Sequence, residues 1–327
     1  MKILITGATG FLGREAVQSA LRRGHRVVAL GGARLPAFAS PTKNLRLDLL
    51  DTAALESLLL DEFPDAVVNC AAVADPAACA AAPARAAALN TALPERLAMF
   101  ANHLSARLVH ISTDMVFDGQ RGHYAHTDMP APLHPPAPMS LYGRVKLDGE
   151  KAVLLHGKRF AVVLRVPLLS GNSEDGTRSL HERLLARWAA GEKTPLFADE
   201  IRQPISASNL ADAAVELCER DNLSGVYHWA GADALSRLEI GRRIAEKFGL
   251  SAAAYIVETT LAETGGASLR PRDLSLDLHP LRGKLRTPVQ TFDTILDEMQ
   301  IPASLAPWHK SQTGQSQIRR FVRGKDF

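Results

Sequence analysis

The sequence is poor in cysteine, and its charges nearly cancel. Three cysteines, Cys70, Cys79 and Cys218, are too few for a disulfide framework and form no CxxC pair, which predicts a reducing, cytoplasmic setting. The 38 Lys and Arg residues stand against 35 Asp and Glu residues, so the formal net charge is only +3. That balance provides no electrostatic basis for binding nucleic acid or an anionic membrane surface.

Long hydrophobic runs are also missing. The longest apolar stretches are interrupted by Arg165 and Pro167 in one place and by Asp75, Pro76 and Pro83 in another. Neither reaches the roughly 18 uninterrupted apolar residues that a membrane-spanning helix needs. The N-terminus passes from a short apolar strand straight to glycines, which is not the pattern of a secretory signal. We therefore expect the chain to begin inside its own fold.

What the chain does have is a regular alternation of strand and helix patterns. The composition, 46% hydrophobic and 22% charged, is that of an ordinary globular protein, and 327 residues suffice for one large α/β unit or two domains. Strands are expected at 3–5, 27–30, 66–69, 108–112, 161–166 and 225–229, and helices at 11–23, 55–60, 84–103, 142–155, 180–190, 209–220 and 236–248. Continuous apolar strands separated by helices predict an α/β fold with a doubly wound parallel sheet.

A glycine-rich turn joins the first expected strand to the first expected helix. Gly7 lets the chain turn sharply, Gly10 lets the backbone approach a pyrophosphate, and Gly13 lets the helix pack close to the strand. The N–H groups of the new helix then face the phosphates. The residues expected to bind a dinucleotide cofactor here are Gly7, Thr9, Gly10, Phe11, Leu12 and Gly13.

The residues after the second expected strand bear on the choice of cofactor. An NAD-selective site usually has Asp or Glu here to bind the ribose 2′-hydroxyl, and this chain has neither. A guanidinium at Arg34 favours NADP(H), because it can pair with a 2′-phosphate. NAD(H), with Arg34 a surface residue, is the alternative. Further cofactor contacts are expected from Asp48 and Leu49 at the adenine edge and from Cys70, Ala71 and Ala72 after the fourth strand.

Tyr142 and Lys146 lie four residues apart on an expected helix, so they share one face. A phenol is a poor acid at neutral pH, because its reference pKa is about 10. A neighbouring lysine ammonium stabilises the phenolate, so Tyr142 can pass a proton to a carbonyl oxygen while a nicotinamide moves the hydride. The Thr113 hydroxyl, at the end of an apolar strand, can bind the same oxygen. We expect these three residues to be catalytic.

The order of these motifs resembles that of the extended short-chain dehydrogenase/reductases, and within them the dTDP-4-dehydrorhamnose reductase group. The matching segments are GATGFLG, VVNCAAVAD, HISTDMVFDG, LYGRVKLDGEKAV, VVLRVP and SLRPRDLSLD. The resemblance implies a catalytic triad of Thr113, Tyr142 and Lys146, with Lys146 also holding the nicotinamide ribose. Its implied substrate contacts, with a structural or active-site asparagine among them, are Val73, Asn90, Asp114, Met115, Leu168, Arg202 and Arg270.

The same resemblance implies a division of the chain and an activity. Residues 1–166, rejoined by 205–230, form a Rossmann domain; residues 167–204 and 231–302 form a smaller substrate domain; and residues 303–327 form a basic tail. The implied activity is the NADP(H)-dependent reduction of a keto group on a nucleotide-linked sugar. Met115 and Leu168 stand where the family usually has aromatic residues, and the loop at 133–140 is longer, so the sugar is left open.

The chain also resembles the regulatory β subunit of methionine adenosyltransferase. The segments that carry this likeness are KLDGEKAVL, LRVPLLSGNSE, GVYHWAGADALSRLEI, RPRDLSLD and LRTP. It implies the same fold and NADP site in a binding subunit, because a triad can persist in a regulatory protein. A nucleotide-sugar epimerase or dehydratase is the third alternative, but Met115 stands where a dehydratase has a second acid.

Other ligands are not expected. His123, His126 and His134 fall in or beside a Pro-rich loop with no acid cluster, which predicts solvated side chains rather than a metal site. The expected partner is a small nucleotide-sugar, with a homodimer or a partner enzyme left open. Neither nucleic acid nor a membrane is an expected partner.

Overall fold

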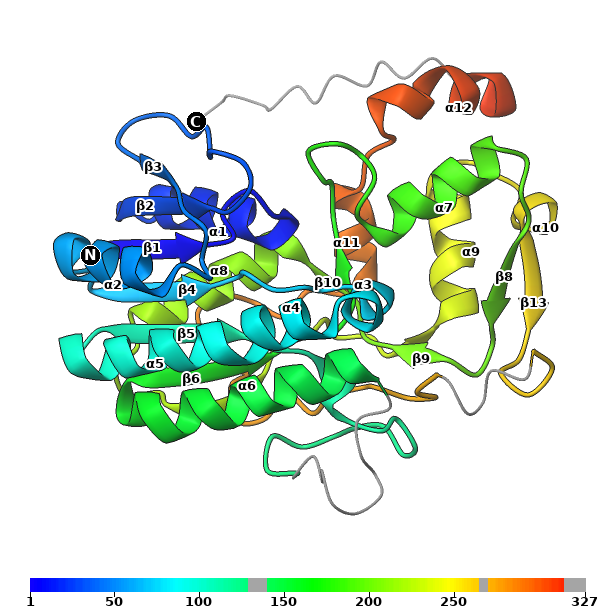
Figure 1. Ribbon diagram of the computed structural model, residues 1–327. Helices are drawn as coiled ribbons and strands as arrows, with labels where there is room; N and C mark the ends of the chain where they lie inside the picture. The colour runs from blue at the N-terminus through cyan, green and yellow to red at the C-terminus, as the bar shows by residue number, and fades with distance from the viewer. Residues whose placement is uncertain (129–139, 265–269, 315–327) are drawn as a thin grey trace.

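A parallel sheet forms the centre of the computed structural model, which describes residues 1–128, 140–264 and 270–314 (Figure 1). Within those residues its strands are hydrogen-bonded in the order β11-β6-β5-β4-β1-β2-β3, and every pair is parallel. Apart from the edge strand β3, their residues are mostly buried. The strands are β1 Lys2–Thr6, β2 Arg26–Gly31, β3 Lys43–Arg46, β4 Ala66–Asn69, β5 Arg107–Ile111, β6 Ala161–Arg165 and β11 Gly225–His228.

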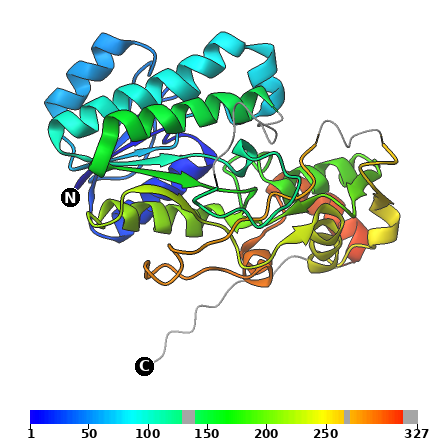
Figure 2. The same cartoon turned by 90° about the horizontal axis from the view of Figure 1, so that it is seen from below.

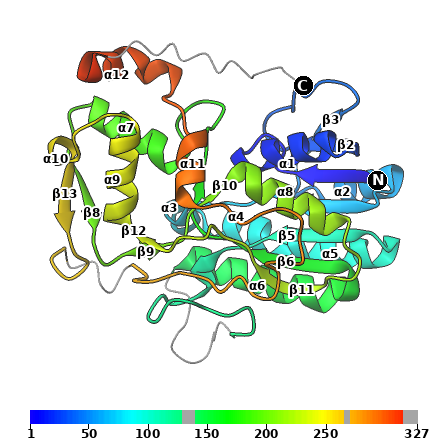
Figure 3. The same ribbon diagram turned by 180° about the vertical axis from the view of Figure 1, so that it is seen from behind.

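Helices cover both faces of the sheet, as Figures 2 and 3 show. One face carries α1 (Phe11–Arg22) and α8 (Ala207–Cys218), and the other carries α2 (Thr52–Glu62), α5 (Leu93–Leu104) and α6 (Leu141–Gly157). Val17 and Leu210 are buried in the first layer, and Leu59 and Leu97 in the second. This confirms the expected doubly wound α/β fold. The strand order reverses between β1 and β4, and in such sheets ligands bind beyond the strand ends at that point.

The long helix expected at residues 84–103 is interrupted. The chain forms α3 (Pro76–Ala81), α4 (Pro83–Ala87), a π-helical turn (Ala88–Ala92) and then α5. In the π turn, Asn90 exchanges two hydrogen bonds of 2.9 Å with the backbone of Val73. A π turn holds one more residue than an α turn, and here it accompanies the docking of Asn90 on the loop after β4. Helix propensity predicted the helix but not this tertiary contact.

A second, smaller region lies beyond the carboxyl ends of the strands (Figure 1). Trp188, Phe248 and Phe292 are buried in a core of its own. Its helices are α7 (Leu180–Ala189), α9 (Arg237–Lys247), α10 (Ala252–Tyr255), α11 (Phe292–Glu298) and α12 (Ala306–Thr313). Short strands pair as β8 (Thr194–Phe197) with β13 (Ile256–Thr259), β9 (Ile201–Arg202) with β12 (Leu235–Ser236), and β7 (Leu169–Ser170) with β10 (Ile205–Ser206).

Two segments lie differently from the division expected above. Residues 306–313, assigned to a basic tail, form α12, where the buried His309 places its Nε2 2.6 Å from the Phe248 carbonyl oxygen. Leu281 and Leu285, assigned to the substrate domain, are buried in the core on the face of the sheet that carries α1 and α8. In both cases a side chain is buried by a partner distant in sequence, which local composition does not reveal. Residues 315–327 of the tail, and 133–139 of the long loop with His134, lie outside the described residues.

No helix in the described part of the chain is long and apolar enough to cross a membrane.

Candidate active site

The glycine turn closes against the end of a neighbouring strand. Gly7 has a φ of +66°, and a Cβ atom there would lie 2.9 Å from the Ala71 backbone nitrogen. A Cβ atom on Gly13 would lie only 2.1 Å from the Gly7 carbonyl oxygen. The turn therefore requires glycine at both positions, because a left-handed conformation and such close approaches exclude a larger residue.

The first turn of α1 is open to an anion. Gly10 is the N-cap, no side chain caps the helix, and no acidic residue lies in its first turn. The N–H groups at this end therefore keep their capacity to bind phosphate oxygens, and the helix dipole favours a negative charge there. Thr9 and Phe11 are half-buried beside this end, whereas Leu12 is buried in the core. These features fit the pyrophosphate of a dinucleotide.

The other residues expected at the cofactor fall into two groups. Arg34 lies over the turn, with an Nη2 to Thr9 carbonyl distance of 3.2 Å, and is 60% exposed, so its guanidinium is accessible. Asp48 is exposed at the edge of the sheet. Leu49 is buried in the core on the face of the sheet that carries α2, α5 and α6, where it contributes packing. Cys70, Ala71 and Ala72 follow β4 beside the turn, and Ala71 is buried.

Tyr142 enters the site from the start of α6. Ser140 caps this helix by accepting a hydrogen bond of 3.1 Å from Gly143 N–H, so Tyr142 occupies the first turn. Burial raises the pKa of Tyr142, and hydrogen bonding with the Thr113 side chain lowers it in part. Thr113 also accepts a hydrogen bond of 3.2 Å from Met115 N–H. A protonated phenol next to a hydroxyl group is an arrangement suited to general acid catalysis.

Lys146 is turned toward β5. Its Nζ donates a hydrogen bond of 2.6 Å to the Ile111 carbonyl and lies 3.4 Å from His110 Nε2. The side chain is buried, and burial lowers its pKa to about 8. The groups that shift the pKa of Tyr142 do not include Lys146. A direct effect of the lysine on the tyrosine therefore stays a prediction.

Asp114 connects the tyrosine to a cluster of arginines. It is buried, and desolvation raises its pKa to about 6, against a lowering by Arg202. Arg202 Nη2 lies 3.0 Å from Glu200 Oε1, and Arg270 Nη1 lies 3.3 Å from Glu200 Oε2. Arg237 Nε lies 4.0 Å from the same carboxylate. One buried carboxylate is thus shared by three guanidinium groups.

This arginine cluster (Arg202, Arg237 and Arg270 around Glu200) carries excess positive charge. Burial lowers the pKa of Arg237 to about 10, and the positive charges of Arg202, Arg183 and Arg270 lower it further against the attraction of Glu200. Sequence reasoning named Arg202 and Arg270 but missed Glu200 and Arg237. No local signal distinguishes those two, because β9 and α9 are brought together only by the pairing of β9 with β12.

The remaining expected substrate contacts surround this site unevenly. Val73 and Met115 pack beside Tyr142 in one small apolar cluster. Asn90 is buried and uses both ends of its amide on the Val73 backbone, so it holds that loop in place. Leu168 packs against the core of the smaller region.

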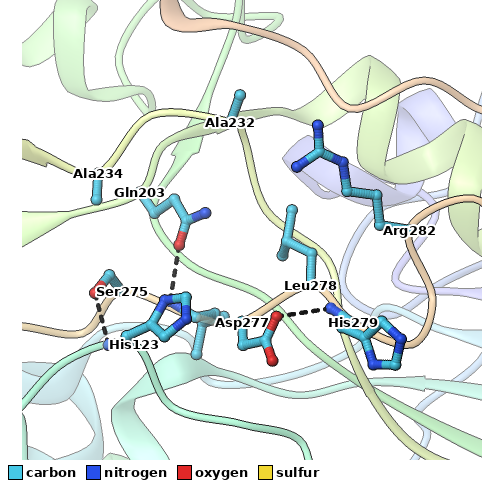
Figure 4. A pocket seen from close by; sticks show the side chains of 10 residues that line it. His123, Gln203, Ala232, Ala234, Ser275, Asp277, Leu278, His279 and Arg282 are labelled. Atoms are coloured by element: carbon cyan, nitrogen blue, oxygen red, sulfur yellow. Dashed lines mark hydrogen bonds between the residues drawn. The ribbon is translucent and has the colours of Figure 1, made fainter.

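A hollow of about 360 Å³ is lined by other residues, and Figure 4 shows the side chains around it. Gln203 is anchored there by hydrogen bonds of 2.7 Å to the Gly231 carbonyl and from Leu276 N–H. His123, His279 and Arg282 stand at its rim. None of the expected site residues lines it. Among the residues described, no group of three His, Cys, Asp or Glu side chains is placed to hold a metal ion.

The chain is similar to known proteins over most of its length. Residues 1–303 match the model of a family described as RmlD substrate binding domain. A probable low-salt glycan biosynthesis reductase, Agl14 of Haloferax volcanii, is 32% identical over 92% of this chain and 97% of its own length. Methionine adenosyltransferase 2 subunit beta of Xenopus laevis is 34% identical over 86% of this chain and 81% of its own length.

A solved structure shares the fold. The dTDP-4-dehydrorhamnose reductase of Bacillus anthracis, in complex with NADP, superimposes with a TM-score of 0.75 at 22% identity, covering 90% of this chain and 97% of the other. A family model that spans almost the whole chain, with relatives above 30% identity over most of it, shows the family directly. The chain belongs to the RmlD substrate binding domain family.

Proposed function

We propose that this protein is an NADP(H)-dependent reductase of a keto group on a nucleotide-linked sugar. The observation that carries the proposal is the proximity of a buried tyrosine–threonine pair to an arginine cluster with excess positive charge. Tyr142 and Thr113 interact, Asp114 influences the pKa of Tyr142, and Arg202 influences that of Asp114. A substrate with a carbonyl at one end and a diphosphate at the other has the chemistry to meet both groups.

The glycine turn would hold the cofactor. The N–H groups at the start of α1 would bind its pyrophosphate, and Arg34 would pair with a 2′-phosphate. When bound, the nicotinamide supplies the hydride. The related Bacillus anthracis structure was solved with NADP, which supports this choice of cofactor. NAD(H) is the alternative, because Arg34 is exposed and no contact among the described residues fixes its guanidinium where a 2′-phosphate would bind.

Tyr142 would act as the general acid. Its raised pKa keeps the phenol protonated, so it can donate its proton to the carbonyl oxygen as that oxygen gains charge. Thr113 would orient the same oxygen through its hydroxyl group. Val73 and Met115 flank the tyrosine with apolar surface, which limits the access of water.

The arginine cluster would bind the diphosphate of the substrate. Glu200 neutralises one of its three arginines and Asp114 acts on a second, Arg202, so about one positive charge is left in excess to attract a diphosphate. Arg202 is held by its own hydrogen bonds, of 2.6 Å to the Ile201 carbonyl and 3.1 Å to the Pro271 carbonyl. A guanidinium held in place loses little freedom when it binds an anion.

The test is the Tyr142→Phe variant, assayed by loss of the NADPH absorbance with dTDP- and UDP-linked 4-keto sugars. We expect kcat to fall by about 10²- to 10⁴-fold, because the general acid is removed, while the Kd for NADPH is unchanged. The matched control is Tyr255→Phe, since Tyr255 hydrogen-bonds Gln312 in the smaller region. Unchanged turnover in Tyr142→Phe would refute the proposal.

A regulatory subunit is the second candidate function. It is favoured by the 34% identity to methionine adenosyltransferase 2 subunit beta, which extends over 86% of this chain. Tight NADPH binding without turnover of any keto sugar, together with a stable complex with a methionine adenosyltransferase catalytic subunit, would support it over the reductase.

A further inference from the structure

Three polar side chains form a row across the carboxyl ends of the central strands. Thr6 of β1 is the register partner of Asn69 of β4, and Asn69 is the register partner of His110 of β5. Directly paired residues of neighbouring strands point to the same face of a sheet. All three side chains are at most 1% exposed, so water cannot serve as their partner. Polar groups buried this deeply are expected to bond one another.

The hydrogen bonds in the row have one consistent direction. Thr6 Oγ1 accepts from the Ala71 N–H at 3.3 Å, so its single hydrogen is available for Asn69 Oδ1 at 2.6 Å. That separation fits an O–H donor better than an amide N–H donor. Asn69 Nδ2 then faces His110 Nδ1 at 3.0 Å and donates to it. A neutral imidazole that accepts at Nδ1 carries its proton on Nε2.

The far end of the row meets Lys146. His110 Nε2 lies 3.4 Å from Lys146 Nζ. An N–H group that points at an ammonium group opposes its charge, whereas the lone pair of a neutral amine can accept that N–H. The other titratable groups that act on Lys146 are Glu150 on its own helix, Cys70 after β4 and Cys79 on α3. Glu150 is the one carboxyl group among them, and it is hydrogen-bonded by Arg165 and Ser112.

We propose that His110 is a positioning residue: held as the Nε2–H tautomer by Asn69 and Thr6, it presents an N–H to Lys146 and controls the charge of that amine. Burial lowers the pKa of Lys146 to about 8, and an N–H directed at the amine acts in the same direction. The neutral state of His110 agrees with this arrangement, because burial and the charge of Lys146 hold its pKa well below its usual value.

This arrangement gives Lys146 a role in the proposed reduction, and in that respect it rests on the proposed function. Each turnover takes one proton from Tyr142, which must be replaced. A lysine that releases its proton near neutral pH can return one to the phenolate and is then neutral itself. The row also joins this lysine to Thr6, the last residue before the glycine turn.

The tautomer is tested in the wild-type protein without cofactor or substrate. ¹⁵N NMR of histidine-labelled protein distinguishes the two neutral tautomers, and a His110→Gln variant assigns the signal. We expect the Nε2–H tautomer, with no protonation of His110 down to the pH at which the protein unfolds. The Nδ1–H tautomer would overturn the proposal, because His110 would then accept a hydrogen bond from the Lys146 ammonium.

A pair of variants tests the control of Lys146. Thr6→Val removes the hydroxyl group that orients Asn69, so the Asn69 amide can turn over. Its oxygen would then face His110 Nδ1, the imidazole proton would move to Nδ1, and Nε2 would accept a hydrogen bond from Lys146. We expect the Lys146 pKa, measured by NMR of ¹⁵N-labelled lysine and assigned with Lys146→Arg, to rise by about one unit, a tenfold gain in proton affinity. Thr6→Ser keeps the hydroxyl group and should leave that pKa at its wild-type value.

The same Lys146 pKa in all three proteins would overturn the proposal, since a merely structural row would not move it. If Thr6→Val does not fold, the tautomer in the wild type still decides. Neither readout needs turnover, so absence of reductase activity would count against the proposed function and leave this inference standing.

Discussion

Two buried carboxylates in this protein are surrounded in opposite ways. Glu150 on α6 faces a single arginine, Arg165 of β6, with hydrogen bonds of 2.8 to 3.1 Å, and it accepts a further one from Ser112. Glu200, before β9, faces three arginines at 3.0 to 4.0 Å. The first site is balanced in charge and lies within the sheet layers, whereas the second has an excess of positive charge and acts on Asp114 through Arg202.

This is the difference that we expect between a structural ion pair and the binding site proposed above. A buried pair that is satisfied within the chain has no charge left for a ligand, and breaking it leaves an uncompensated charge. In a cluster with more cations than anions, repulsion between the cations is unfavourable, and binding of an anionic ligand reduces that repulsion. Charge balance around a buried carboxylate therefore indicates whether the group serves the fold or the substrate.

The largest expected effect is on the balanced site. Glu150→Ala leaves the buried Arg165 charge without its carboxylate partner, so we expect the free energy of unfolding to fall by about 3 to 5 kcal/mol, measured by urea titration. The matched control is Glu192→Ala, whose pair with Arg187 is about half exposed and is worth less than about 1 kcal/mol. A loss below about 1 kcal/mol in Glu150→Ala would remove the contrast between the two carboxylates.

A smaller effect is expected at Asp114, the second carboxylate that faces the arginine cluster. Its pKa is raised from 3.8 to about 6 in the folded protein, so the folded state binds its proton more tightly than the unfolded state does. The charged form therefore opposes folding, with a cost that grows between about pH 4 and pH 6 and is constant above. From about 1.4 kcal/mol per unit, that cost is on the order of 3 kcal/mol at neutral pH.

Asp114→Asn should remove this cost. We expect the variant to match the wild type in urea unfolding near pH 4 and to exceed it in stability at pH 7.5. A variant that is less stable than the wild type at pH 7.5 would show that the carboxylate is needed to balance Arg202, and that the cluster has no excess charge to offer.

The smallest expected effect is on substrate affinity. Arg202→Gln removes one cation from the unbalanced cluster, so we expect the KM for a nucleotide-diphosphate sugar to rise about tenfold, with little loss of stability. Steady-state kinetics with the nucleotide-sugar and competition by the free nucleoside diphosphate measure it. The control is Arg242→Gln, which removes an exposed partner of Glu258 in the same region. If Arg202→Gln loses stability while its KM is unchanged, Arg202 serves the stability of the fold and not the binding of substrate.

The parallel sheet and the positions of the candidate reacting groups could be predicted because they follow from local patterns. The turn from Gly7 to Gly13 joins one strand to one helix, and Tyr142 and Lys146 share a helix face four residues apart. Apolar strands alternate with helices through residue 228, so a doubly wound parallel sheet could be predicted, whereas its strand order came from the structure. The short strands β7, β8, β9, β10, β12 and β13 were not expected, because pieces of two to four residues carry too little periodicity.

The charge of the site depends on contacts that no local pattern contains. Glu200 meets Arg237 and Arg270 only because β9 pairs with β12 and the chain returns near residue 270. His110 meets Lys146 because strand register sets Thr6, Asn69 and His110 in one row. Spacing within a helix or a turn is a property of neighbouring residues, whereas the partners of a buried charge come from segments that only the folded chain brings together. For this reason the reaction could be proposed from the residues in order, while the electrostatics of the site required the tertiary structure.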